Sequence, residues 1–242
     1  MAGHSKWAQI KRKKAVADAK KGKLFTKLIR EITIAARQGG GNPDGNPRLR
    51  LAIDQARAAN MPMENIERAI KKATGELEGS QYEEIIYEGY GPGGVAILIE
   101  AVTDNKNRTV SELRHIFSRH GGRLAESGSV NWMFDRKGII TIEKSVINED
   151  DLIMLALDAG ADDVIVESDY YEVQTSIENF EKVRKNLLEK NVKIENASLQ
   201  YVPQNLMKIE GKENETVLKL LEILEDHDDV QNVYTNADVN EI

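Results

Sequence analysis

The hydrophobic spacing of the chain changes near Ser80, and this change constrains the fold more than any other feature. Before Ser80, apolar residues recur at intervals of three and four, which places them on one face of an α-helix. After it, runs rich in β-branched residues alternate with amphipathic segments, a pattern typical of sheets covered by helices. We therefore expect an α+β protein, with an N-terminal three-helix bundle followed by α/β domains.

The N-terminal region is predicted to contain three helices behind a basic arm. The arm covers residues 1–22, and the first helix covers 23–38 and ends at the glycines 39–41. The second helix is expected to begin near Pro47 and the third at Pro62, because the fixed φ of proline suits a first helical turn.

Beyond Ser80 the predicted strands and helices form four βαβ units in a row, which suits two split-βαβ, ferredoxin-like sheets. Thr109 and Glu112 predict a capping box at the start of one helix, and GPGG at 91–94 predicts a hairpin turn. The expected strands are 83–90, 94–103, 124–134, 138–143, 162–167, 170–176, 193–202, 205–210 and 230–236, and the expected helices are 109–120, 149–159, 178–191 and 214–227.

The four units can be paired in two ways. The first two and the last two can each form a domain, or the middle two can form a domain that is inserted between the outer two. In the second case the hinges would be residues 135–138 on one side and Pro203 and Gln204 on the other. The order of elements is compatible with both pairings.

Charge is divided unevenly along the chain. Residues 1–75 hold 17 Lys and Arg against 6 Asp and Glu, a net charge of +11, whereas residues 76–242 hold 16 against 34, a net charge of −18. A dense basic segment attracts polyanions, and an acidic one repels them. The N-terminal region is therefore the predicted nucleic-acid-binding part of the molecule.

The candidate contact residues are cations of the arm, of the first helix and of the glycine-rich loop after it. On the first helix they share a face opposite the apolar stripe, and in the loop they lie beside a helix N-terminus that could hold a phosphate. They are Lys6, Lys11, Arg12, Lys13, Lys14, Lys20, Lys21, Lys27, Arg30, Arg37, Arg48 and Arg50.

Three further residues are secondary candidates. Trp7 could stack on a base or anchor the arm to the bundle, and we expect anchoring because large apolar side chains near a terminus usually pack on their own domain. Lys106 and Arg108 lie in a loop of the acidic region, at a strand-to-helix junction where loops often carry function.

The turn at 60–62 also joins two helices in the manner of a helix-turn-helix. Cations and an amide would then lie on the second helix, at Asn65, Arg68, Lys71 and Lys72. The pattern is not diagnostic of base reading, because tight turns join helices in most small bundles. It leaves recognition of backbone shape, including that of RNA, equally open.

Enzymatic chemistry finds no support in the sequence. There is no cysteine, the four histidines lack metal-ligand spacing, and no nucleotide-binding or nucleophile-elbow motif is present. We expect no catalytic residues, no metal and no cofactor. With no apolar run of about 20 residues and no secretory signal pattern, we expect a cytoplasmic protein that does not enter a membrane.

Long segments of the chain resemble the YebC/PmpR family. They are MAGHSKW at 1–7, GKLFTKLIREITIAARQGGGNPDGNPRLRLAI at 22–53, MPMENIERAIKKATGE at 61–76, YEGYGPGGVAILIE at 87–100 and TDNKNRT at 103–109. One departure is the run at 11–14, where a histidine is expected within the basic stretch, although the positive charge is kept.

The resemblance implies a three-helix N-terminal domain and two α/β domains, with the third inserted within the second. The corresponding boundaries are 1–79, 80–135 plus 204–242, and 136–203. It also implies a DNA-binding transcriptional regulatory protein, and other members are linked to translation. The alternative function is therefore a ribosome-associated factor that binds ribosomal RNA and relieves stalling, so duplex DNA, ribosomal RNA and the ribosome are the candidate partners. The oligomeric state and any regulatory ligand are left open.

Overall fold

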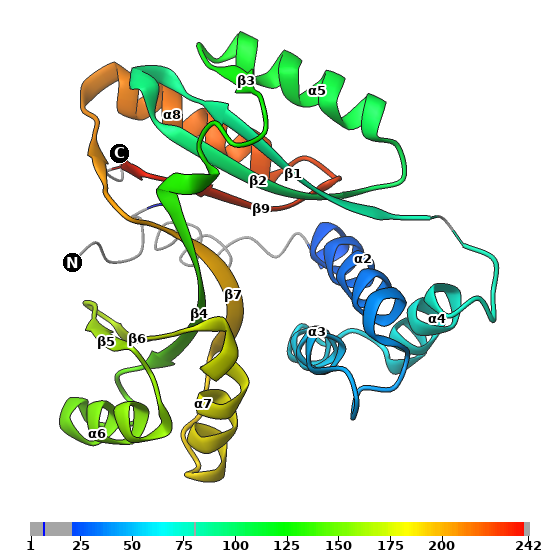
Figure 1. Cartoon of the computed structure of the whole chain (residues 1–242), viewed down its shortest axis with the longest axis vertical. Coiled ribbons are helices and arrows are strands. Elements are labelled where there is room, and N and C mark those ends of the chain that lie inside the picture. Colours follow the sequence, from blue (N-terminus) through cyan, green and yellow to red (C-terminus); the bar gives the residue numbers. More distant parts are fainter. Residues whose placement is uncertain (1–6, 8–20, 80, 240–242) are drawn as a thin grey trace. The chain divides into compact units, whose positions relative to one another are not determined.

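The computed structural model describes residues 7, 21–79 and 81–239 of the 242-residue chain. The chain divides into two compact units, one of which is Asp135–Val202. The other contains the described residues on both sides of that segment. The fold is α+β, with a helical N-terminal bundle, an α/β domain and a second α/β domain inserted within the first (Figure 1).

The bundle consists of helices at the positions that the apolar spacing predicts. Leu28 and Ile32 of the first helix pack against Leu49, Ile53 and Ile66 of the other two. Asn46 caps the second helix by accepting a hydrogen bond from the backbone N–H of Leu49 (3.0 Å), and Pro47 occupies its first turn as expected. The helices are α2 (Lys21–Gly39), α3 (Pro47–Ala58) and α4 (Met63–Ala73).

The first α/β sheet is antiparallel, with the strand order β3-β1-β2-β9, and α5 and α8 lie on one side of it (Figure 1). The 3₁₀ turn Pro92–Gly94 joins β1 to β2, which confirms the predicted hairpin. The elements are β1 (Glu83–Tyr90), β2 (Ala96–Thr103), α5 (Lys106–Arg119), β3 (Arg123–Ala125), α8 (Gly211–Glu225) and β9 (Val230–Thr235).

The predicted strand 124–134 is wrong, because most of that segment is a loop. β3 ends at Ala125, and a 3₁₀ turn at Asn131–Met133 precedes the next strand. The buried carboxylate of Glu88 holds the loop by accepting hydrogen bonds from the backbone N–H groups of Gly128, Val130 and Asn131, at 2.7, 2.7 and 2.9 Å. Burial alone would raise the pKa of Glu88, but these backbone donors lower it below the usual value.

The expected capping box at Thr109 is also wrong. α5 begins one turn earlier, and Asn105 caps it by accepting from the backbone N–H of Arg108 (3.1 Å). The Thr109 hydroxyl is buried inside the helix instead, where it donates to Asp229 Oδ2 (2.7 Å). The predicted strand 205–210 is likewise reduced to the two residues of β8 (Met207–Lys208), which pair in parallel with β10 (Ala237–Asp238).

The inserted unit has the strand order β5-β6-β4-β7, in which β6 pairs antiparallel with both β4 and β5. This is the split-βαβ arrangement that the alternation of elements predicts. Its elements are β4 (Phe134–Glu143), α6 (Glu149–Ala159), β5 (Asp163–Val166), β6 (Tyr170–Thr175), α7 (Ile177–Glu189) and β7 (Asn196–Pro203).

Candidate nucleic-acid interface

The cationic face of α2 contacts carboxylates and carbonyls of the α/β domain. Lys23 Nζ donates to the carbonyl of Asp226 (2.8 Å), and Lys27 Nζ donates to the carbonyl of Glu225 (2.9 Å). Arg30 donates to the carbonyl oxygens of Val102 (3.1 Å) and Asp228. The face of α2 that the sequence predicts to contact phosphates is therefore packed on the turn between α8 and β9.

Asp229 is the centre of this contact. Its side chain is 3% exposed, with Arg30 on one carboxylate oxygen (3.0 Å) and Arg108 (2.8 Å) and Thr109 on the other. Burial alone would raise the pKa of Asp229, but the hydrogen bonds from Arg108 and Thr109 and the charge of Arg30 lower it. Two of the predicted contact residues, Arg30 and Arg108, thus neutralise one buried carboxylate.

Arg48 and Arg37 also make contacts within the protein. The guanidinium of Arg48 bridges Glu31 (2.7 Å) and Glu84 (2.7 Å), and these carboxylates raise its pKa against the opposing effect of burial. Arg37 donates to the carbonyl of Tyr82 (3.1 Å). These two arginines connect the bundle to the start of β1.

The glycine-rich loop between α2 and α3 is held by hydrogen bonds from Asn46 and Arg50 to nearby backbone carbonyls. Arg50 donates to the carbonyls of Pro43 (3.2 Å) and Asp44 (2.8 Å). The Asn46 amide caps α3 and also donates to the carbonyls of Ala35 (2.8 Å) and Gly40 (2.9 Å). The predicted phosphate position at the N-terminus of α3 is therefore filled by the side chain of Asn46.

The secondary candidates are also engaged. Lys106 forms an ion pair with Glu83, and Arg108 pairs with Asp104 (3.1 Å) in addition to Asp229. Trp7 is 3% exposed and belongs to the core of the first α/β domain, with Ile97 and Leu220. The expected anchor on the bundle is wrong, and stacking on a base would require Trp7 to leave this core.

The remaining predicted residues belong to the arm. The side chain of Lys21, at the start of α2, is not described. The others lie outside the described residues and are Lys6, Lys11, Arg12, Lys13, Lys14 and Lys20.

A cationic surface that faces solvent is found on α4. Arg68, Lys71 and Lys72 are exposed, as is Arg57 at the end of α3. Arg68 pairs with Glu64 one turn earlier (2.5 Å), and neither Lys71 nor Lys72 forms an ion pair with another described residue. Arg68, Lys71 and Lys72, hereafter the α4 cations, were indicated in the sequence only by the nondiagnostic helix-turn-helix pattern.

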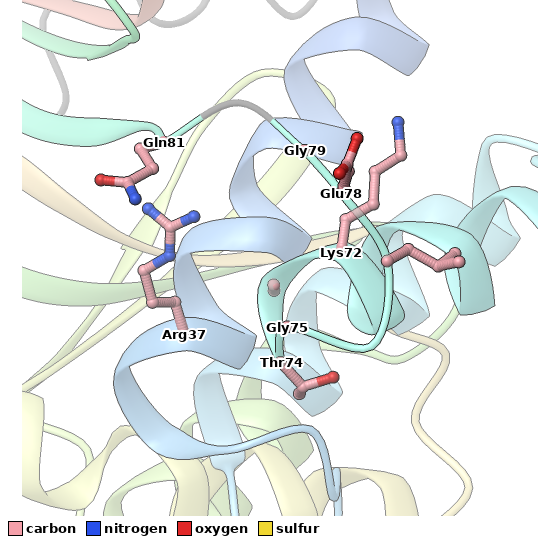
Figure 2. A pocket seen from close by; sticks show the side chains of 9 residues that line it. Arg37, Lys72, Thr74, Gly75, Glu78, Gly79 and Gln81 are labelled. Atoms are coloured by element: carbon pink, nitrogen blue, oxygen red, sulfur yellow. The ribbon is translucent and has the colours of Figure 1, made fainter.

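A pocket of about 980 Å³ lies beside this surface, between the end of α2, the end of α4 and the segment that leads to β1. Figure 2 shows Arg37 and Gln81 on one side of it and Lys72 and Glu78 on the other. Thr74 and Gly75 complete the floor below Lys72. The lining therefore combines two cations with the carboxylate of Glu78 and small polar groups, so the pocket is polar but carries no strong excess of positive charge.

Glu112, His227 and Asp229 are close enough to suggest a metal site, but their hydrogen bonds argue otherwise. His227 Nδ1 accepts from the backbone N–H of Asp229 (3.1 Å), which places the proton of a neutral ring on Nε2, beside Glu112 (2.8 Å). Both Asp229 oxygens are bonded to arginines. The cluster is thus a hydrogen-bonding network, with no ring nitrogen open to a metal.

Comparison with known proteins identifies the family. A model described as "TACO1/YebC protein N-terminal domain" matches residues 5–76, and one described as "TACO1/YebC second and third domain" matches residues 82–237. The chain belongs to the TACO1/YebC family, which confirms the resemblance seen in the sequence motifs.

Similar proteins carry regulatory names. A "Probable transcriptional regulatory protein" of Chlorobaculum parvum is 59% identical over 244 residues, covering 100% of this chain and 96% of that protein. One of the same name from Dictyoglomus turgidum is 61% identical, covering 99% and 96%. The crystal structure of a conserved hypothetical protein from Aquifex aeolicus matches with a TM-score of 0.87 and 50% identity, covering 93% of each chain. Over the described residues, no helix has the length and apolar character that a bilayer span requires.

Proposed function

We propose that this protein is a non-enzymatic, DNA-binding transcriptional regulatory protein that contacts duplex DNA through its N-terminal domain. The observation that carries the proposal is the segregation of charge, +11 in residues 1–75 against −18 in the rest of the chain. Neutralising backbone phosphates with lysine and arginine releases counterions, and this supplies much of the affinity of such proteins. The regulatory names of its relatives support the same role.

Within the N-terminal domain, we propose that the basic arm and the α4 cations make the phosphate contacts. A cation can gain from a phosphate only if it does not first have to give up a buried carboxylate. Arg30 would leave Asp229 buried without its full set of partners, a loss of several kcal/mol for a hydrogen-bonded buried pair. Lys71 and Lys72 face no such cost, because they are exposed and form no ion pair with a described residue.

The proposal assigns the other domains no phosphate contacts. The nucleic-acid-binding domain is residues 1–79, the α/β domain is 80–135 with 204–242, and the inserted domain is 136–203. The regulatory names of the relatives favour a role other than catalysis. A cytoplasmic location fits a DNA-binding role.

The test compares two triple variants of the full-length chain that remove the same charge. Arg68→Ala, Lys71→Ala and Lys72→Ala remove the α4 cations, whereas Lys182→Ala, Lys190→Ala and Lys193→Ala remove three exposed lysines of the inserted unit. Labelled duplex DNA and a structured RNA are titrated by fluorescence anisotropy at several salt concentrations. The first variant is expected to weaken binding and to lower the log–log salt slope by roughly 1 per lost phosphate contact.

The control variant is expected to bind as the wild type does. Equal losses in both variants would show that only net charge matters and would refute the role of α4. Tighter binding to structured RNA than to duplex DNA at every salt concentration would replace the DNA-binding role with that of a ribosomal RNA-binding translation factor.

A further inference from the structure

The inserted unit contains a long acidic run that the nucleic-acid proposal leaves unused. Residues 145–181 contain eleven Asp and Glu and no Lys, Arg or His. The run covers α6, β5, β6 and the first turn of α7. Glu172 is buried, but the other carboxylates of the run are exposed or partly exposed and repel phosphates, so a partner of this surface must be sought among cations.

Helix α6 is apolar on two sides, although only one side is covered by its own unit. Leu152, Ala156 and Ala159 are buried. Met154 is 61% exposed and Leu157 is 48% exposed, although both are large apolar side chains. A single exposed apolar residue is ordinary, but two at positions i and i+3 form a continuous stripe on the helix surface.

Acidic residues flank this stripe at both ends. Asp150 precedes Met154 by four positions and Asp158 follows it by four, so all three lie on the face that also carries Leu157. Asp151, which lies three positions before Met154, is exposed on the same side. We call Asp150, Asp151, Met154, Leu157 and Asp158 the α6 face.

The α6 face is held in place by its own fold. Asn148 caps α6 by accepting from the backbone N–H of Asp151 (2.9 Å), and the Asn179 amide of α7 donates to the carbonyl of Gly160 (3.2 Å) at the other end. Lys182, directly after the acidic run, reaches the same end of α6 near Gly160. The face between these two fixed ends is therefore a rigid, preformed surface.

We propose that the α6 face is a docking site for a cationic amphipathic helix of a partner protein. Apolar side chains of that helix would cover Met154 and Leu157, and its lysines or arginines would pair with Asp150, Asp151 and Asp158. Charge complementarity selects this partner. The acidic run repels anions, and a purely apolar helix would offer no cation to pair with the flanking carboxylates. Methionine at the centre suits such a surface, since its flexible thioether adapts to the shape of the partner.

This inference goes beyond the proposed function and does not depend on it. It gives the molecule two recognition surfaces of opposite charge, one for nucleic acid and one for protein.

The test measures binding of a labelled probe peptide to the full-length protein by fluorescence anisotropy. The probe is an 18-residue peptide with leucines at helical spacing on one face and lysines on the other, and its control has the same composition in scrambled order. The ordered peptide is expected to bind at least tenfold more tightly than the scrambled one. Equal binding of the two would overturn the proposal, because simple charge attraction would then explain the interaction.

Two pairs of variants locate the site. Met154→Ser with Leu157→Ser is expected to weaken binding of the ordered peptide about tenfold, whereas Leu188→Ser with Leu206→Ser, exposed apolar residues elsewhere, should leave it unchanged. Asp150→Asn with Asp158→Asn should reduce the salt dependence of binding, and Glu189→Gln with Glu210→Gln, which removes the same charge, should not. Circular dichroism checks that each variant is folded.

Unchanged binding in both α6 variants would overturn the site. Sedimentation velocity of the wild type and of the Met154→Ser, Leu157→Ser variant tests the competing occupant. A wild-type dimer that the variant dissociates would show that a second copy of the chain covers α6, and would overturn the proposal in favour of self-association.

Discussion

Helices α2 and α4 carry similar cations, but the fold uses them in opposite ways. The cations of α2 are bonded to carboxylates and carbonyls near the end of α8 and the start of β9, whereas those of α4 face solvent. A count of charges along the sequence treats the two helices alike. A basic segment can therefore face solvent in one helix and form part of a domain contact in another.

The difference has an energetic basis. A solvated ion pair contributes about 0–1 kcal/mol, but breaking a buried, hydrogen-bonded pair costs about 3–5 kcal/mol because one charge remains buried. We therefore expect substitutions on α2 to act on stability, and substitutions on α4 to act on binding.

Asp229→Ala should lower the free energy of unfolding by about 3 kcal/mol at pH 7, since it leaves Arg30, whose side chain is only 11% exposed, without its carboxylate. The folded-state pKa of Asp229 is lowered, so the stability it contributes is present above the unfolded pKa of about 3.9 and is lost as pH falls through the folded value. Urea denaturation at several pH values measures both effects. Asp228→Ala, an exposed neighbour, is the control. An equal loss of unfolding free energy in the control would show that burial of the Arg30–Asp229 pair does not govern the effect of substitutions at this contact.

Glu172 is also a buried carboxylate, but its pKa is raised whereas that of Asp229 is lowered. Burial raises its pKa to about 7, so the charged form costs stability as pH rises from about 4.5 to 7. Glu172→Gln keeps a hydrogen-bonding group beside Gln174 and should raise the free energy of unfolding by about 2 kcal/mol at pH 8, with little effect at pH 4. Glu143→Gln on the exposed end of β4 should change little, and a destabilised Glu172→Gln protein at pH 8 would contradict the prediction.

Lys27 and Lys23 provide a graded test along α2. The ion pair of Lys27 with Glu225 has side chains that are 20% and 14% exposed, whereas that of Lys23 with Asp226 has side chains that are 46% and 53% exposed. Lys27→Ala should therefore cost about 1 kcal/mol and Lys23→Ala less than about 0.5 kcal/mol, as measured by urea denaturation. The reverse order would show that burial does not govern these contacts.

The α4 triple variant should have the smallest effect on stability. Arg68→Ala, Lys71→Ala and Lys72→Ala should leave the free energy of unfolding within about 0.5 kcal/mol of the wild type, because exposed side chains are replaced by a residue that favours helices. Thermal denaturation of the same variant protein that is used in the binding assay measures this stability. A large loss of stability would mean that the lost affinity reports unfolding rather than phosphate contacts.

Local patterns predicted the elements well where one side of an element is buried. The helix expected over 149–159 is observed as Glu149–Ala159, and the strand expected over 83–90 is observed as Glu83–Tyr90. The predictions that were wrong involve long-range partners. Glu88 holds the segment 126–131 as a loop, and Asp229 draws Thr109 into the interior of α5.

The site was predicted only in outline. Segregated charge favours the N-terminal region as the proposed nucleic-acid-binding part, because net charge is a property of composition. It does not identify the contact residues, because Arg30 and Asp229 are 199 positions apart and no local pattern links them. The solvent-facing cations of α4 were visible in the sequence, but they were not distinguishable from those of α2.

The family, the helical and mixed regions and the sign of each region's charge can be read from the sequence, since these follow from motifs, periodicity and composition. Which cations are bonded to buried carboxylates and which face solvent depends on the tertiary structure. It also decided that Trp7 lies in the α/β core and that Met154 and Leu157 remain uncovered on α6. The physical reason is that burial and pairing are set by residues distant in sequence, and burial makes the difference between a charge that binds a partner and one that holds the fold together.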